Sequence, residues 1–473
     1  MNLPVQVVVL WSDALLFALI AACAGFAWWT RRQAVLRAAW VRVGKDPVAM
    51  AAATVLAVFV LVGALDSLHY RARLPAQPGQ PVHYAVEVNS VLDALLAPLR
   101  LNTEKTYSAP LATRLFAMET LPGSNERAFP RLVYGGAHLD AAPGGHECDV
   151  VRRTLIGLGG GLLLWLPVFL WLRKKVGAGE TTALQGGRAR NALLAVADGD
   201  TVKNKANNAI AATLLGIFLL TGVALSLGGG YHVLGTDKVG QDVLYLSLKS
   251  IRTGLLIGTL TTLVTLPIAI VLGLMAGYFG GWIDDVIQYL YTTLNSIPGV
   301  LLIAAAVLMM QVVIDTHPDW FATAAERADA RLLALCLILG MTSWTGLARL
   351  LRGETLKLRE LEFVQAAHAF GVGPLLILRR HILPNLMHIV LIALVMDFSG
   401  LVLAEAVLSY VGVGVDPTTI SFGGMINAAR MELAREPMVW WSLAAAFCFM
   451  FILVLAANLF ADAVREAFDP RAS

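Results

Sequence analysis

Residues 362–384 read EFVQAAHAFGVGPLLILRRHILP and are the most informative stretch of the chain. Four apolar side chains recur in it at the helical spacing i, i+3, i+4 and i+7, and two of them are alanines, which let another backbone approach closely. These four residues are Phe363, Ala366, Ala367 and Phe370. Gly371 predicts a left-handed end to this helix, and Pro374 and Pro384 predict the starts of a second short helix and of the next long helix. The pattern therefore predicts two rigid helices at a fixed angle, which is an arrangement suited to docking on another protein.

The same residues leave an alternative open. Arg379 and Arg380 favour an amphipathic helix that lies on a membrane surface, because basic side chains are attracted to anionic lipid headgroups. Taken alone, the stretch does not choose between docking on a protein and lying on a membrane.

The composition on both sides of this stretch is typical of a membrane protein. Of the 473 residues, 57% are hydrophobic and 15% are charged, against roughly 45–50% and about 25% in soluble domains. The formal net charge is +3, which is not the basic excess of a nucleic-acid-binding chain. The cysteines are too scattered for a disulfide framework or a CxxC metal site; they are Cys23, Cys148, Cys336 and Cys448.

Nine apolar runs are long enough to cross a bilayer as helices, which takes about 20 residues. They lie near residues 11–29, 48–66, 154–172, 207–227, 254–277, 286–312, 331–350, 386–412 and 439–461. The first run has no cationic region before it and is followed by Arg31 and Arg32, so it reads as a retained span and not as a cleaved signal peptide. The fold class expected is an all-α polytopic membrane protein.

The basic residues predict the orientation of these spans, because cytoplasmic loops carry an excess of Lys and Arg. Basic residues collect after the first run, after the third run and between residues 349 and 384. These loops are therefore expected inside and segment 67–153 outside, with the N-terminus outside and the C-terminus in the cytoplasm.

Segment 67–153 is polar and rich in proline, and only the run around 90–100 looks helical. A small folded cap fits this composition. Six residues in it suggest metal ligands, but their spacing fits no zinc pattern, so we expect no metal site and favour a solvated loop. They are His138, Asp140, His146, Glu147, Cys148 and Asp149. Further along, Asp237 and Asp242 are expected to cap a short external helix.

No enzymatic motif is evident in the sequence. The Gly-rich stretch between Gly177 and Gly187 lacks the Lys-Ser/Thr of a phosphate loop, and neither GxSxG nor HExxH occurs. We therefore expect no catalytic residues and no cofactor in this chain.

With these features in view, residues 362–384 resemble the cytoplasmic EAA signature of binding-protein-dependent ABC importer permeases. In that signature a glycine lies thirteen residues before a proline, as Gly371 and Pro384 do here. Gln365 stands where the family has its first acidic residue, and Glu362 lies one turn earlier on a neighbouring face.

Four further stretches resemble the dipeptide and oligopeptide branch of this family, in the family's order. They are LGTDKVGQDVL (234–244), MAGYFGGWID (275–284), AEAVLSYVGVGVDP (404–417) and NLFADAVREAFDP (458–470). The resemblance covers about residues 230–470, roughly half of the chain, and implies a six-span type I importer core, MetI-like in fold, plus about three extra N-terminal spans.

The domain division that follows has four parts. They are residues 1–66 with N-terminal spans and a basic loop, 67–153 as an external insert, 154–228 with extra or linking spans, and 229–473 as the permease core with its coupling loop at 353–384. Two alignments remain open, because either 48–66 or 207–227 matches the family's first span, each following a basic stretch.

The resemblance also implies partners and a mechanism. A second permease subunit completes the path, two ATP-binding subunits that hold ATP and Mg²⁺ dock on the loops, and an extracytoplasmic solute-binding protein delivers the solute. The location implied is the bacterial inner membrane. The residues expected to couple to the ATPases are Glu362, Phe363, Gln365, Ala366, Ala367, Gly371 and Pro384.

Two acidic residues within the eighth run, Asp397 and Glu405, are candidates for the solute path, because an ionisable group in a span is costly unless it faces a cavity or a partner. A structural hydrogen bond is the alternative for each, and Ser409, Gly412 and Gly414 suggest a helix break that Glu405 caps.

Two other classes of protein compete with this interpretation. In an ion-coupled secondary transporter, Asp397 and Glu405 would be the ion-coupling pair, but no inverted repeat is evident. A membrane-embedded enzyme or scaffold would carry its activity in 67–153, where no nucleophile–base cluster is evident. Four glycines of the third run, Gly157, Gly159, Gly160 and Gly161, are expected to let that span pack closely against the core or the second subunit.

Overall fold

The computed structural model of the chain describes residues 5–30, 32–74, 83–120, 127–139, 145–183, 191–321 and 323–468. Within them, nine helical stretches are long and apolar enough to cross a membrane, in agreement with the number predicted. They are α1 (Trp11–Thr30), α3 (Pro47–Asp66), α6 (Gly145–Ala183), α7 (Asn191–Gly228), α8 (Val243–Phe279), α10 (Gly299–Thr316), α11 (Ala324–Ser343) with α12 (Thr345–Arg359), α15 (Leu383–Val411) with the turns before it, and α17 (Trp441–Phe468).

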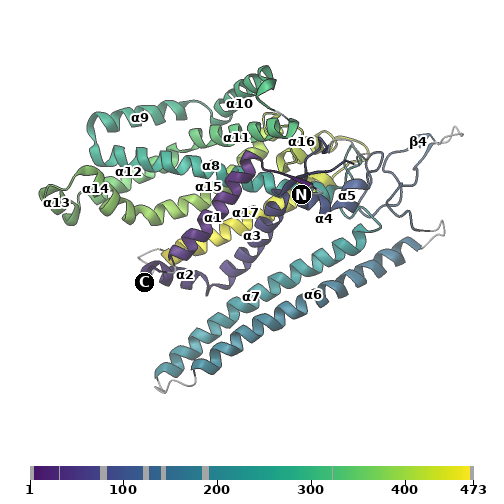
Figure 1. Ribbon diagram of the computed structural model, residues 1–473, viewed down its shortest axis with the longest axis horizontal. Helices are drawn as coiled ribbons and strands as arrows, with labels where there is room; N and C mark the ends of the chain where they lie inside the picture. Colours follow the sequence, from purple (N-terminus) through teal and green to yellow (C-terminus); the bar gives the residue numbers. More distant parts are fainter. Residues whose placement is uncertain are drawn as a thin grey trace.

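The sixth predicted span, 286–312, is wrong in its bounds. A break at Ile297 and Pro298 divides it into α9 (Gly281–Ser296) and the spanning helix α10. Ile297 is extended, with φ −92° and ψ 132°, because a residue before proline is pushed out of the helical region. In Figure 1, α9 lies along the edge of the bundle beside α12.

Short helices and strands gather at the two ends of the bundle. The helices are α2 (Ala34–Val43), α4 (Val91–Leu95), α5 (Ala97–Leu101), α13 (Glu362–Ala369), α14 (Pro374–Ile377) and α16 (Phe422–Arg430). Strands β1 (Val5–Val8), β2 (His69–Ala72) and β3 (Asn89–Ser90) form an antiparallel sheet in that order, with Val5 opposite Ala72 and His69 opposite Ser90. β4 (Glu119–Thr120) pairs with β5 (Arg127–Ala128).

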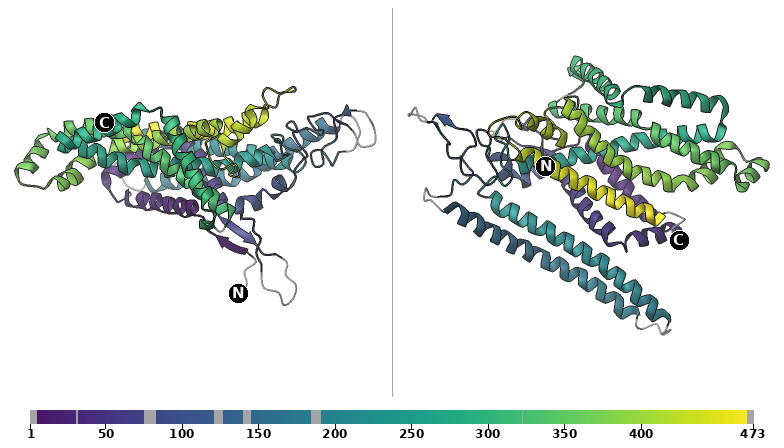
Figure 2. Two further views of the ribbon diagram at one scale, coloured as in Figure 1. Left: turned by 90° about the horizontal axis from the view of Figure 1, so that it is seen from above. Right: turned by 180° about the vertical axis from the view of Figure 1, so that it is seen from behind.

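This sheet brings the N-terminal strand and the insert to the same end of the molecule, and α13 and α14 lie at the other end (Figures 1 and 2). The described part of the insert is therefore a folded cap, and its helical run at 90–100 is confirmed as α4 and α5. α6 begins at Gly145, within the residues assigned to the insert.

The early spans differ in how they pack. α3 lies against α8 and α17, and its Phe59 belongs to the same core cluster as Leu255 and Val402. α6 and α7 form a long hairpin that touches the rest of the bundle mainly where α7 meets α3, and Figure 1 shows it standing apart from the other helices.

Two of the four glycines of α6 make the close contact that holds this hairpin. A Cβ at Gly157 would lie 2.7 Å from the Gly222 carbonyl oxygen, and a Cβ at Gly161 would lie 2.6 Å from that of Phe218. Gly159 and Gly160 face open space. Close approach was predicted correctly, but the partner is α7 and not the core.

Candidate functional site

The element at 362–384 begins as two helices joined by a sharp turn, as predicted. α13 ends at Ala369, and Gly371 follows with φ +78°. The Val372 amide donates to the Ala367 carbonyl over 3.1 Å, which closes the helix end. Pro374 occupies the first position of α14, where its missing N–H leaves no bond unmade.

The second helix is not separate from the following span, which corrects the prediction. A π turn, Leu378–Ile382, follows α14 directly, and α15 continues from it, so the helix runs from Pro374 to Val411. Pro384 lacks an N–H and sits in the first turn of α15. The Asn385 side chain donates to the nearby His381 carbonyl at 2.6 Å. α14 is therefore continuous with a spanning helix.

The apolar residues of α13 divide between two faces. Val364 and Ala367 are buried, whereas Phe363, Ala366 and Phe370 are exposed. Phe370 is 87% exposed. The sequence predicted one apolar face made of four residues, and this prediction is wrong for Ala367, which packs inward. The other three residues form an exposed apolar surface.

The inner face continues into the core of the bundle. Val364 and Ala367 share one cluster of buried side chains with residues of α8, α12, α14, the π turn and α15. These residues include Leu274, Leu351, Ile377, Ile382 and Leu386. Close packing makes such a cluster stiff. The exposed surface of α13 is therefore held on a rigid root, by which we mean this buried cluster.

Polar contacts of two arginines of α12 hold the helices beneath this cluster in place. Both nitrogens of the Arg352 fork lie 2.6 Å from the Asp284 carboxylate oxygens, joining α12 to α9. The hydrogen bond from Arg352 lowers the pKa of Asp284. Arg359 Nη1 donates to the Tyr278 carbonyl at 3.1 Å, at the end of α8, where Gly280 has φ +65°.

The two polar residues of α13 lie on its surface. Gln365, at the position where the EAA signature has an acid, donates through Nε2 to the Glu360 carbonyl over 3.1 Å. Glu362 is exposed in the first turn, where a carboxylate stabilises the helix dipole.

The structure does not bring Asp397 and Glu405 into one site. Glu405 is 2% exposed and accepts hydrogen bonds from Ser409 at 2.7 Å and Ser421 at 2.9 Å, which tie the end of α15 to α16. α15 then ends at Val411, and Gly412 has φ +89°. Asp397 is partly exposed and has no hydrogen bond or ion pair with the residues that the structure describes.

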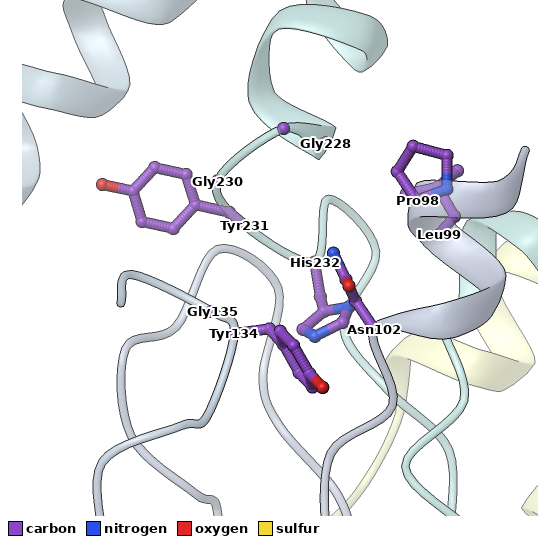
Figure 3. A pocket seen from close by; sticks show the side chains of 10 residues that line it. Pro98, Leu99, Asn102, Tyr134, Gly135, Gly228, Gly230, Tyr231 and His232 are labelled. Atoms are coloured by element: carbon purple, nitrogen blue, oxygen red, sulfur yellow. The ribbon is translucent and has the colours of Figure 1, made fainter. Parts of the chain in front are cut away.

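At the other end, a buried ionic junction joins the insert to α8. Figure 3 shows one member, His232, with Tyr134 and Gly135 at the wall of a small cavity. His232 Nδ1 lies 2.8 Å from Asp242 Oδ2, and its Nε2 lies 3.5 Å from Glu104 Oε1. Burial favours the neutral imidazole, but the hydrogen bond with Asp242 and the negative charges of Asp242 and Glu104 outweigh it and raise the pKa of His232 to about 9. The cavity, about 20 Å³, has room for roughly one water.

The sequence analysis missed this junction. Asp242 caps the spanning helix α8 through the Leu244 and Tyr245 amides and does not cap a short external helix. Glu104 accepts from the amides of Val133, Tyr134 and Gly135. The available signal was a histidine and an acid at the edge of a span, although their partner Glu104 is remote in sequence.

The cluster around His146 and Asp149 is held by pairing within the protein. Asp149 accepts from His138 at 2.7 Å, Arg153 at 2.8 Å and Tyr231 at 3.0 Å. No group of three potential metal ligands occurs among the described residues. Asp140, also considered as a ligand, lies outside them.

Comparison with known proteins places these features in one class, the membrane subunits of solute transporters. The profile of the family "Binding-protein-dependent transport system inner membrane component" matches residues 269–473. The oligopeptide transport system permease protein OppC of Mycobacterium tuberculosis is 33% identical over 242 residues, which are 51% of this chain and 77% of the relative. The glutathione transport system permease protein GsiD of Pectobacterium atrosepticum is 32% identical over 242 residues, 51% of this chain and 73% of the relative.

The chain belongs to this family of binding-protein-dependent inner membrane components, the permease subunits of ABC importers. Among solved structures, a chain of the inward-facing MetNI methionine ABC transporter is similar at a TM-score of 0.34 and 17% identity, over 47% of this chain and 94% of that chain.

Proposed function

We propose that this chain is one half of the translocation path of an ATP-driven importer for di- or oligopeptides. The relatives named for oligopeptide and glutathione transport support peptides as the solute class. The other half would be a second permease subunit. Two ATP-binding subunits would hydrolyse ATP with Mg²⁺, and an external binding protein would deliver the peptide.

The observation that carries this proposal is the exposed apolar surface of α13 on its rigid root. An apolar patch that stays exposed at the end of a membrane bundle is typical of an interaction site. Phe363, Ala366 and Phe370 would contact an ATPase subunit, with Glu362 and Gln365 at the same surface. Ala367, Gly371 and Pro384 would fix its angle to α15.

The packing of the early spans supports an assignment of the six core spans. α3 lies against α8 and α17 and is therefore our candidate for the first span of the core. α1, α6 and α7 are then the three additional spans. In the proposed orientation the basic loops and α13 face the cytoplasm, and the N-terminus and the insert lie outside.

The test is a pull-down of the tagged chain from its native membranes in mild detergent, with mass spectrometry and an ATPase assay. We expect a second permease and ATP-binding subunits with the wild type. Phe370→Arg should remove the ATPase subunits and their activity but keep the second permease, because it places a charge in the apolar contact.

The matched control is Val86→Arg. Val86 is 85% exposed and Phe370 is 87% exposed, but Val86 lies in the insert. The control should retain every subunit. Recovery of the chain alone, able to drive uptake with a proton or sodium gradient, would refute the proposal and favour a secondary transporter.

A further inference from the structure

A cavity of about 690 Å³ lies among the outer ends of α3, α8 and α11, beside the segment 86–88 of the insert. This volume lies within the usual range for small-molecule sites, roughly 300–1,000 Å³. Six ionisable residues line it: Asp66, His69, Glu87, Lys249, Arg252 and Asp329.

Arg252 is a buried cation of this wall with unused donors. It is only 9% exposed. Its Nε donates to Ser67 Oγ at 3.1 Å, and its Nη2 donates to Ser12 Oγ at 3.0 Å and Asp13 Oδ1 at 2.6 Å. A guanidinium has five N–H donors, and the two on Nη1 have no partner among the described residues. Nη1 is not among the fully buried unpaired atoms of the described residues, so it is accessible to a bound group.

The acids of the wall already have partners. Asp329 accepts from the Ser12 amide at 3.1 Å and from the Ser12 hydroxyl. Asp66 accepts from Ser90 Oγ at 2.7 Å, and Glu87 pairs with Arg100.

Lys249 is also satisfied. Its ammonium bonds both oxygens of Asp93, at 2.6 and 2.7 Å. Arg252 pairs with Asp13 through Nη2 and is therefore the cation of the wall that still has donors, those on Nη1, for an incoming group. A carboxylate matches it, because it accepts from a guanidinium with geometric specificity.

The charge of the whole wall restricts the ligand further. Three carboxylates, two basic side chains and His69 line the cavity. A bare anion would meet net repulsion, whereas a zwitterion brings its own ammonium group for the acidic side.

We propose that this cavity receives a short peptide with free ends and that Arg252 binds the peptide's C-terminal carboxylate through Nη1. The identity of the ligand rests on the proposed function in peptide import. Asp13 is a positioning residue, since its Oδ1 holds Arg252 and its Oδ2 lies 2.7 Å from His69 Nδ1. This assigns a role to α1, which supplies Asp13 and Ser12.

The first test varies the ligand and leaves the protein intact. Trialanine, its C-terminal amide, its N-acetyl derivative and acetate are titrated against the purified full chain in phosphatidylcholine nanodiscs, with binding followed by saturation-transfer NMR. We expect trialanine to bind, amidation and acetylation to weaken binding by about tenfold or more, the change expected for one charged hydrogen bond, and acetate not to bind. Equal binding of trialanine and its amide would overturn the proposal.

Nanodiscs that contain phosphatidylglycerol distinguish a solute carboxylate from an anionic lipid headgroup. The affinity for trialanine should stay the same in them. Competition by the anionic lipid would assign the site to lipid and overturn the proposal.

The second test uses Arg252→Lys, which keeps a cation beside Asp13 but removes the planar fork. We expect about tenfold weaker binding of trialanine, unchanged binding of the amide and a similar melting temperature. Arg435→Gln, a surface arginine paired with Glu432, is the control and should bind as the wild type does. Wild-type binding by Arg252→Lys would refute the role of Arg252.

Neither test needs ATPase subunits or transport. If no partner subunits are recovered in the pull-down, the importer proposal is refuted, but the binding measurements can still be interpreted. If trialanine does not bind, the peptide site is refuted and the importer proposal stands.

Discussion

His232 illustrates how single residues hold the insert onto the membrane bundle. Its imidazole lies between Asp242, which caps α8, and Glu104, which organises the turn at Val133–Gly135. Burial works against the ionised form of both His232 and Glu104, but their hydrogen bonds prevail and lower the pKa of Glu104 to about 2. His232 and Glu104 are thus both charged at neutral pH.

The attachment of the insert should therefore weaken in alkali. A group whose pKa rises from 6.5 in the unfolded chain to about 9 in the folded chain contributes its full stability below about pH 6.5 and loses it as the pH rises through 9. We expect faster amide exchange in residues 104–116 and 228–242 from pH 6.5 to 9, after correction for intrinsic exchange. His232→Gln should abolish this dependence, and an unchanged pH profile in that variant would contradict the assignment.

Gly371 is the second residue whose geometry matters, because its φ of +78° sets the turn after α13. A side chain in the left-handed region costs about 1–2 kcal/mol. Gly371→Ala should therefore reduce the ATPase subunits that co-purify with the chain. Gly373→Ala is the control, since Gly373 has φ −62° and open space around it, and equal losses in both variants would argue against a role for the turn.

At the scale of elements, α6 and α7 depend on backbone contact and not on large side chains. The Cβ positions of Gly157 and Gly161 point at the α7 backbone, and Gly222 fits between them. Small residues at such a spacing let two helices approach closely in a membrane, where packing replaces the hydrophobic driving force.

The hairpin offers its own matched controls. Gly161→Leu should force the helices apart and cost about 1–3 kcal/mol as an overpacked contact, whereas Gly160→Leu, one residue away, should be neutral because it faces open space. The measurement is the thermal stability of the purified chain in detergent, together with cross-linking between cysteines placed on α6 and α7. Similar stability of the two variants would show that the close contact is not used.

The continuous helix from α14 to α15 is the other element of note. Its π turn lies where Pro384 removes a backbone donor. This arrangement places the exposed surface of α13 one sharp turn away from a spanning helix, so a small displacement at the loop reaches the bundle without crossing a flexible joint.

For the whole molecule, the two ends of the bundle differ in character. One end carries the β1–β2–β3 sheet and the insert, and the other carries α13 and α14 (Figure 2). In the proposed orientation the second end faces the cytoplasm, as the positive-inside rule predicts.

This orientation predicts the labelling of two exposed positions by a membrane-impermeant maleimide. With Cys23, Cys148 and Cys448 replaced by serine, Lys238→Cys should react in right-side-out vesicles and Gln365→Cys in inverted vesicles. Both residues are exposed, so in vesicles that contain this chain without ATPase subunits, access depends on the side of the membrane alone. The reverse pattern would invert the topology.

The sequence by itself determined the number of spans, the helix–turn–helix at 362–377 and the family, because hydropathy, glycine and proline act locally. It misplaced the sixth span, since an apolar run does not reveal a break at Ile297 and Pro298. Only the tertiary structure decided that Ala367 packs inward, that Glu405 is satisfied while Arg252 keeps unused donors, and that His232 meets Glu104. These facts depend on partners remote in the chain, and hydrogen bonding and burial are set by neighbours in space.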